Sequence, residues 1–438
     1  MRVLLILAAI PEFRVDQPFA YPIMSPPLTI LLLNAICKQA KHDVDLIDTR
    51  LFMERGETKW VINYDALEKR IAESNAEVAG ISFLSTAVTQ GLRVAEICRR
   101  QGKTVVAGGL HTSVAVDDFL RSGNFDYLIQ GEAEEELPRL LEALAQGDLP
   151  RFPAAPVVKR APVIHDLSIV PAVSDFSLYA PIFDQYRTSQ RGIYVETSRG
   201  CVKRCTFCEI ARDSGAAASP YRLIPIETAI DSIKQAVAQQ DANYILLTDS
   251  IATLSKKHFL DFVSAVNDLP GLTIQFNSTV DCWDTERAEA CRRVPCTVWF
   301  GFETGSQRLL DFMKKGTKVE RAYQAARICS EYGTRSAFNV LLGIPGETEE
   351  DYRETLKFFH EFPAAYPNPN LFNPLPGTAL YDYCVQHDLV KDSAVIWDIE
   401  TVKRTGAGPL HHHDYALVLK YFDQLSALQD ERKTYLMP

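Results

Sequence analysis

The stretch that decides the fold is GIYVETSRGCVKRCTFC, residues 192–208, in which a short apolar run leads into three closely spaced cysteines. Cys201, Cys205 and Cys208 follow the pattern C-x3-C-x2-C. Thiolates at this spacing on one loop can converge on a small cluster, and iron–sulfur clusters are held by cysteine thiolates. Three thiolates on a four-iron cluster leave one iron open. The alternatives are three unrelated cysteines or a zinc site that lacks its fourth ligand.

Basic residues surround the cysteine loop, namely Arg199, Lys203 and Arg204. Nearby positive charge lowers the pKa of a thiol and offsets part of the charge of an anionic cluster. We therefore expect these three side chains to favour the thiolate forms of the cysteines.

A series of apolar runs separated by helical patterns begins at residue 191. In residues 226–239, for example, the apolar residues recur on one helical face. Six such units favour a partial (β/α)6 barrel over residues 191–390, with its chemistry at the carboxyl ends of the strands. Residues 391–438 form a small mixed C-terminal segment with an expected helix near 414–430. The expected strands are 192–197, 243–249, 272–279, 297–304, 336–343 and 369–376.

The first 145 residues show the same alternation, which predicts an α/β domain with a doubly wound, Rossmann-like parallel sheet. Its ligand should lie at the carboxyl ends of the strands. Residues 146–190 contain six prolines and are expected to be a linker that packs on the surface. The expected strands of residues 1–145 are 2–8, 43–48, 77–83, 104–109 and 127–131, with helices near 28–40, 64–74, 88–101, 115–121 and 134–145.

Composition excludes several classes of protein. The 438 residues carry 46 Lys and Arg against 56 Asp and Glu, a net charge of −10, which does not favour a nucleic-acid partner. No apolar stretch reaches about 18 residues, so no membrane span is expected. The apolar start is expected to be a buried strand rather than a signal peptide. Ten cysteines in such a chain do not indicate a disulfide framework, and a cytoplasmic location is expected.

The cysteine pattern, with Phe207 before its last cysteine, resembles the signature of the radical S-adenosylmethionine (SAM) superfamily. The resemblance covers roughly residues 190–390. It implies that Cys201, Cys205 and Cys208 hold a [4Fe-4S] cluster whose open iron chelates the amino and carboxylate groups of SAM. It also implies that the reduced cluster cleaves SAM to a 5′-deoxyadenosyl radical, which removes hydrogen from a substrate.

Other expected strand ends resemble further motifs of this superfamily. Residues 301–305, GFETG, resemble the motif near the amino acid or ribose of the cofactor, and Glu303 is the expected acceptor; the alternative is a surface carboxylate. Residues 343–348, GIPGET, resemble the turn whose backbone approaches the adenine, which makes Gly343 and Pro345 cofactor-binding residues unless this is a plain turn. Thr248, Asp249 and Ser250 either face the substrate or cofactor, or cap a helix.

The N-terminal domain resembles the cobalamin-binding module that often precedes such barrels. Ser82 and Leu84 after the third strand, and Gly108 and Gly109 after the fourth, match the residues that border the slot for the nucleotide tail. The first loop lacks the Asp-x-His-x-x-Gly motif whose histidine ligates cobalt, and neither His42 nor His111 replaces it. Small residues at strand ends also occur in other doubly wound folds.

Together these features predict a radical SAM enzyme that acts on an unactivated C–H bond of a small metabolite. The leading hypothesis is cobalamin-dependent methyl transfer in natural-product biosynthesis, with flavodoxin or ferredoxin as electron donor. A cobalamin-independent dehydration, deoxygenation or rearrangement of a sugar or amino sugar is the alternative. A tRNA methylthiotransferase and a non-catalytic cobalamin sensor are less favoured. The net charge of −10 suits a cationic substrate, and no single side chain is identified as catalytic.

Overall fold

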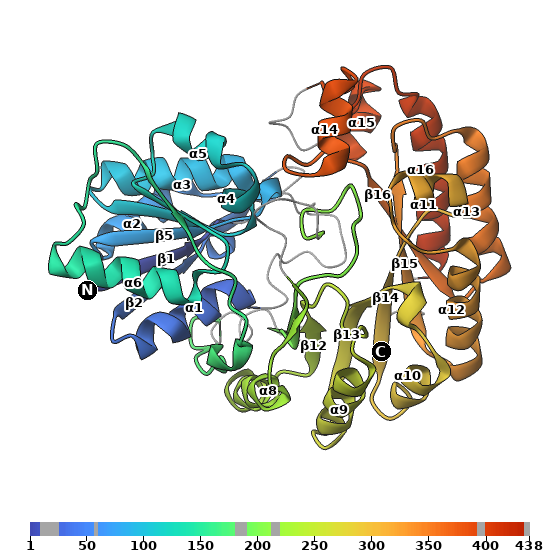
Figure 1. Ribbon diagram of the computed structural model, residues 1–438, viewed down its shortest axis with the longest axis horizontal. Helices are drawn as coiled ribbons and strands as arrows, with labels where there is room; N and C mark the ends of the chain where they lie inside the picture. Colours follow the sequence, from blue (N-terminus) through green and yellow to red (C-terminus); the bar gives the residue numbers. More distant parts are fainter. Residues whose placement is uncertain (9–25, 57–59, 180–190, 212–219, 392–398, 433–438) are drawn as a thin grey trace. The chain divides into compact units, whose positions relative to one another are not determined.

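A computed structural model describes two compact units (Figure 1). The first comprises residues 1–194 and 227–242, and the second comprises residues 195–226 and 243–438. No helix in the described part of the chain is both long and apolar enough to cross a bilayer. The structure describes residues 1–8, 26–56, 60–179, 191–211, 220–391 and 399–432.

The first unit is built on a six-stranded sheet with the order β2-β1-β5-β6-β7-β8, in which all neighbouring strands pair in parallel. The inner strands are near-continuous apolar runs, as expected for a sheet that is buried on both faces. This confirms the doubly wound sheet. Its strands are β1 (Arg2–Leu7), β2 (Asp43–Asp48), β5 (Val78–Ser82), β6 (Thr104–Gly108), β7 (Tyr127–Gln130) and β8 (Val157–Arg160).

Helices cover both faces of this sheet. In Figure 1, α3 and α5 lie on one side of the sheet and α1 and α6 on the other. A small antiparallel pair, β3 (Met53–Arg55) and β4 (Trp60–Ile62), lies beyond β2 in the chain. The helices are α1 (Leu28–Gln39), α2 (Tyr64–Glu73), α3 (Val88–Arg100), α4 (Leu110–Val114), α5 (Val116–Ser122) and α6 (Ala133–Gln146).

The range that the sequence suggested as a linker contributes to this unit. Strand β8 lies within residues 146–190 and extends the sheet beside β7, with Val157 opposite Tyr127. Only four residues long and flanked by prolines, β8 offers too short a pattern to be recognised as a strand. Helix α8 (Ile226–Gln240) also contacts this range, because the backbone N–H of Val173 donates to Ser232 Oγ at 2.9 Å.

The second six-stranded sheet has the order β16-β15-β14-β13-β12-β9 and lies in the second unit except for residues 192–194 of β9. The neighbours from β12 to β16 pair in parallel. The sequential strand order agrees with the predicted partial barrel. The strands are β9 (Gly192–Val195), β12 (Tyr244–Leu247), β13 (Thr273–Ser278), β14 (Cys296–Glu303), β15 (Arg335–Leu342) and β16 (Ala365–Leu371), with a short antiparallel pair of β10 (Ser198–Arg199) and β11 (Arg222–Leu223).

The sixth strand differs from the sequence prediction of 369–376. Strand β16 starts and ends earlier, and it contains Pro367 and Pro369. Proline is tolerated in an edge strand, which β16 is, although the same residues in isolation indicate a turn. Helix α16, which confirms the helix expected near 414–430, packs against this edge strand. The helices are α9 (Lys256–Asn267), α10 (Thr285–Ala290), α11 (Gln307–Phe312), α12 (Val319–Tyr332), α13 (Glu349–Glu361), α14 (Ala379–Gln386), α15 (Ile399–Thr405) and α16 (Tyr415–Glu431).

Aromatic side chains form the core between β14, β15 and α13. The ring centroids of Phe302 and Phe358 lie 4.5 Å apart, and Phe338 lies 4.9 Å from Phe358. Such ring pairs contribute about 0.5–1.5 kcal/mol each beyond the apolar area that they bury. This packing holds the carboxyl end of β14, where Glu303 lies, against a rigid layer.

Candidate functional site

A buried carboxylate holds the start of the cysteine loop. Asp249, which follows β12 and is 1% exposed, accepts hydrogen bonds from Thr197 N at 3.0 Å, Thr197 Oγ1 at 2.7 Å and Ser198 Oγ at 2.5 Å. Burial raises the pKa of Asp249, and these donors oppose that rise. The sequence suggested that Asp249 faces a ligand or caps a helix, whereas the structure shows it tying the chain after β9 to the end of β12.

Replacing Asp249 by asparagine should destabilise this unit. An amide offers a single acceptor oxygen and places an NH2 group among hydrogen-bond donors, so we expect a loss of about 1–3 kcal/mol in the free energy of unfolding. Thermal denaturation measures this loss. The matched control is Asp268→Asn at an exposed position after α9, which should leave the melting temperature unchanged. Equal melting temperatures for both variants would show that the carboxylate does not hold the loop.

The three thiols lie on one loop, with Cys205 buried and Cys201 and Cys208 half-buried. The backbone N–H of Cys208 donates to the carbonyl of Cys205 at 3.3 Å, which curls the loop back on itself. Burial raises the pKa of Cys205 to about 11; the Lys315 ammonium lowers it, and the two other thiols raise it further. On the Cys205 thiol, the Lys315 ammonium and the two other thiols therefore act in opposite directions.

The donor set fits an iron–sulfur cluster, because three thiols from one loop are the ligands that such clusters use. Across the described residues, no group of three or more His, Cys, Asp or Glu side chains is arranged around a single metal ion. Two of the three basic residues expected to favour the thiolates, Arg199 and Lys203, pair with carboxylates. Arg199 Nε lies 2.9 Å from Glu196 Oε2, and Lys203 Nζ lies 2.7 Å from Asp281 Oδ2. The cation that lowers the pKa values of the Cys205 and Cys208 thiols, against the effect of burial, is Lys315.

Glu303 lies at the end of β14 in an unusual backbone conformation. Its φ angle is +69°, and the pairing of β14 with β15 shifts register between Gly301 and Glu303. This bulge turns the carboxylate toward Lys315, whose Nζ lies 2.6 Å from Glu303 Oε1. A Cβ atom at Gly301 would lie 2.6 Å from the same Nζ atom, so glycine leaves the space that the ammonium occupies. Sequence reasoning missed Lys315, because a lysine after a short helix carries no distinguishing pattern.

The turn after β15 is held by its own glutamate. Glu347 Oε2 accepts hydrogen bonds from the backbone N–H groups of Gly343 at 2.6 Å and Ile344 at 3.1 Å. Burial raises the pKa of Glu347 to about 8, although these donors oppose the rise. Gly343 has a φ angle of +86°, and a Cβ atom there would lie 3.8 Å from His413 Nε2. The C-terminal segment therefore borders this turn, which the sequence did not indicate.

An apolar cluster brings the cysteine loop and this turn together. Phe207 packs against a cluster of buried residues that includes Ile344 of the turn and Met313 after α11. The backbone N–H of Thr206 donates to the Met313 carbonyl at 2.9 Å, and Leu380 N–H donates to the Thr206 carbonyl at 2.7 Å. The predicted site residues Phe207, Glu303 and Gly343 thus lie around one region of the second unit.

In the first unit, the predicted residues lie at the carboxyl ends of two adjacent strands. Ser82 ends β5 and is paired in register with Gly108, which ends β6. Leu84 is 59% exposed, and a Cβ atom at Gly108 would meet open space. Gly109 differs, because its φ angle is +100° and a Cβ atom there would lie 3.0 Å from Ser82 Oγ. These strand ends therefore present an apolar surface with room beside it.

His111 lies behind these strand ends. Its Nδ1 atom is 3.1 Å from Ser85 Oγ, and its Nε2 atom is 3.3 Å from Asp118 Oδ2. Burial lowers the pKa of His111, while the Asp118 carboxylate opposes this. The imidazole is 3% exposed, and its contact with Ser85 links α4 to the residue that follows Leu84.

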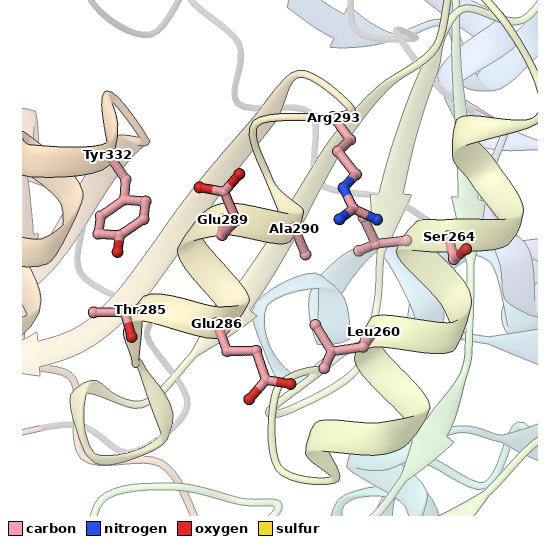
Figure 2. Close-up of a pocket in the computed structure, with 9 residues that line it drawn as sticks. Leu260, Ser264, Thr285, Glu286, Glu289, Ala290, Arg293 and Tyr332 are labelled. Atoms are coloured by element: carbon pink, nitrogen blue, oxygen red, sulfur yellow. The ribbon is translucent and has the colours of Figure 1, made fainter.

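A separate hollow of about 460 Å³ lies among the outer helices of the second unit (Figure 2). It contains none of the predicted site residues. Apolar side chains of α9 form part of its wall, and Glu286, Glu289 and Arg293 add charge. The lining residues are Leu260, Val263, Ser264, Thr285, Glu286, Glu289, Ala290, Arg293 and Tyr332.

Known proteins resemble both halves of the chain. Residues 195–359 match the family model of the radical SAM superfamily, and residues 23–141 match that of the B12 binding domain. An uncharacterized methyltransferase of Pyrococcus horikoshii is 25% identical over 408 residues, which cover 89% of this chain and 85% of the relative. A putative methylthiotransferase of Methanocaldococcus jannaschii is 26% identical over 378 residues, which cover 80% of this chain and 76% of the relative.

A solved structure shares the fold. The radical SAM methyltransferase TsrM from Kitasatospora setae, with cobalamin and a [4Fe-4S] cluster bound, matches with a TM-score of 0.66 at 19% identity. The match covers 88% of this chain and 75% of that chain. The chain therefore contains a B12 binding domain, matched over residues 23–141, followed by a radical SAM domain, matched over residues 195–359.

Proposed function

We propose that this enzyme is a cobalamin-dependent radical SAM methyltransferase that acts on a C–H bond of a small molecule. The observation that carries the proposal is the three-thiol loop beside Glu303 in a chain that also has a B12 binding domain. When bound, the cluster would supply the electron that cleaves SAM, and cobalamin would carry the methyl group. Cys201, Cys205 and Cys208 are the proposed ligands of the [4Fe-4S] cluster.

The residues around the loop have distinct proposed tasks. The buried Glu303 carboxylate is placed to accept hydrogen bonds from the ammonium group of SAM. The turn at Gly343 and Pro345 offers backbone to the adenine, and Glu347 keeps this turn in shape through its two hydrogen bonds. Phe207 supplies an aromatic ring that packs against the buried cluster to which Ile344 belongs.

The first unit supplies the proposed cobalamin site. Leu84 and Gly108 leave an open apolar surface at the ends of β5 and β6, which suits the flat rings of a nucleotide tail. Ser82 and Gly109 shape the edge of this surface, since the close approach between them excludes any side chain at Gly109. Ligands of open α/β sheets bind outside the carboxyl ends of strands, which supports this placement.

The proposed substrate is a small molecule. The net charge of −10 favours a cationic small molecule, and natural-product biosynthesis remains the proposed role. The likeness to a putative methylthiotransferase makes that activity a second candidate. Reduced flavodoxin or ferredoxin is the proposed electron donor, and no nucleic acid is part of the leading proposal.

The products of SAM test the proposed function. Anaerobically reconstituted protein, supplied with hydroxocobalamin, SAM and reduced flavodoxin, should form both 5′-deoxyadenosine and S-adenosylhomocysteine. The first product reports radical formation, and the second reports methyl transfer to the cobalamin. We expect omission of hydroxocobalamin to abolish S-adenosylhomocysteine formation.

Other outcomes separate the alternatives. Formation of 5′-deoxyadenosine alone, with no corrinoid retained by the protein, would support cobalamin-independent chemistry. That result would contradict the methyltransferase proposal. Modification of bulk tRNA with a methylthio group, measured by nucleoside mass spectrometry, would favour the second candidate.

A further inference from the structure

The ammonium group of Lys315 is buried beside the cysteine loop. Lys315 is 8% exposed and follows α11 in a tight turn, in which Lys314 and Gly316 have φ angles of +49° and +64°. The backbone N–H of Lys315 donates to the carbonyl of Leu310 at 2.9 Å, which anchors the turn. Burying a lone ammonium is costly unless it is paired. The anchored turn therefore holds the Lys315 ammonium in a buried position.

Two kinds of group surround the ammonium. Glu303 Oε1 lies 2.6 Å from Lys315 Nζ, and the ring centre of Phe207 lies 5.7 Å from it. Burial opposes the charge on Lys315, but the Glu303 carboxylate and the thiols of Cys205 and Cys208 outweigh burial and raise the pKa of Lys315. The lysine thus stays protonated in contact with the Glu303 carboxylate and close to Phe207, which directly precedes Cys208 in the chain.

The other lysine of this region has different partners. Lys203 lies within the cysteine loop itself, yet its Nζ atom is 2.7 Å from Asp281 Oδ2 and 3.0 Å from the Gly316 carbonyl. Its charge is therefore balanced by a carboxylate outside the loop. The segment that carries Lys315 contacts the cysteine loop directly, because the backbone N–H of Thr206 donates to the Met313 carbonyl at 2.9 Å.

From this geometry we propose that Lys315 is a positioning residue of the radical SAM site, with two linked tasks. Its ion pair holds the Glu303 carboxylate in place for SAM, and its positive charge raises the reduction potential of the cluster bound by the adjacent thiols. Charges interact strongly where water is excluded, so a buried cation stabilises the reduced, more negative cluster over the oxidised one. This inference rests on the proposed function, because it requires the cluster.

The backbone beside Lys315 leaves room for its ion pair with Glu303. A Cβ atom at Gly301 would lie 2.6 Å from Nζ and 3.0 Å from Glu303 Oε1. The bulge that gives Glu303 its positive φ angle lies at the same place. A positive φ angle is costly for a residue other than glycine, and it occurs here at the residue whose carboxylate pairs with the ammonium.

The test is the midpoint potential of the reconstituted cluster, measured by redox titration with electron paramagnetic resonance in the absence of SAM and cobalamin. Lys315→Met should shift the potential to a more negative value, and Glu303→Gln should shift it to a more positive one. Lys315→Arg should stay close to the unmodified protein, since it keeps the charge. The control is Lys256→Met, which removes a lysine that pairs with Asp284 and Glu286.

A second measurement, the affinity for SAM, tests whether the ion pair with Lys315 positions the Glu303 carboxylate. Equilibrium binding of SAM to the reconstituted protein should weaken about tenfold in Lys315→Met, while Lys315→Arg should retain most of the affinity. A purely structural lysine would lower protein yield without shifting potentials in opposite directions. The double variant Lys315→Met with Glu303→Gln keeps the protein testable, because removing both members of a buried ion pair is better tolerated than removing one.

The outcomes separate this inference from the proposed function. If the unmodified protein assembles no cluster, the proposed function fails. If clusters assemble but Lys315→Met and Glu303→Gln leave the potential unchanged or shift it in the same direction, the role of Lys315 is wrong. If Lys315→Met does not fold, the double variant is compared with Glu303→Gln, from which it differs only in the lysine: a potential below that of Glu303→Gln supports the inference, and an equal one overturns it.

Discussion

Cys205→Ala should leave the protein without an iron–sulfur cluster. Cys205 is the buried member of the three thiols, and its loss leaves two ligands on a loop that otherwise supplies three. We expect iron and sulfide content to fall to background after anaerobic reconstitution, together with the visible absorption of the cluster. Cleavage of SAM should stop as well. The same result is expected for Cys201→Ala and for Cys208→Ala.

The control for this experiment is a cysteine outside the loop. Cys98 lies in α3 and is fully buried, so Cys98→Ala removes a thiol and introduces a small cavity without touching the loop. It should retain the full iron content at a slightly lower melting temperature. A normal iron content in any one of the three loop variants would contradict the ligand assignment.

Gly108→Val should abolish cobalamin binding while leaving the fold intact. The added side chain meets open space and sits at the end of a strand, where valine is well accommodated. It would fill the surface on which the nucleotide tail is proposed to lie. We expect hydroxocobalamin affinity to fall by at least about tenfold, equivalent to about 1.4 kcal/mol. Absorption spectra of the protein after gel filtration measure the retained corrinoid.

Two comparisons make this result interpretable. Gly123→Asn adds a side chain in open space at the end of α5, where asparagine tolerates the φ angle of +66°, and cobalamin binding should persist. Gly108→Val should also still form 5′-deoxyadenosine, since the cysteine loop is unchanged. Corrinoid retention equal to that of the unmodified protein would move the proposed site away from these strand ends.

Some parts of the site follow from short stretches of sequence. The three cysteines lie within eight residues, so their spacing alone places the thiols on one loop. Strands such as β1 and β14 are marked by continuous apolar runs, and helices such as α8 by one apolar face. These signals need no knowledge of distant parts of the chain, and the predicted α/β class was correct for both sheets.

Strand β16 shows where such local signals fail. Its two prolines indicate a turn when they are read in isolation, and only its place at the edge of the sheet makes them compatible with a strand. Strand β8 was missed for a related reason, because four residues between prolines carry little pattern until β7 lies beside them.

The amino-acid sequence alone therefore indicated the cysteine loop, the alternation of strands and helices, and the position of small residues at the strand ends. Only the tertiary structure showed which residues distant in the sequence hydrogen-bond to that loop or act on its thiols. Asp249 reaches Thr197 across 52 residues, and Lys315 replaces the nearby Lys203 as the cation that acts on the thiols. The physical reason is that spacing and periodicity act within a few residues, whereas the pairing of buried charges depends on how the sheet orders its strands.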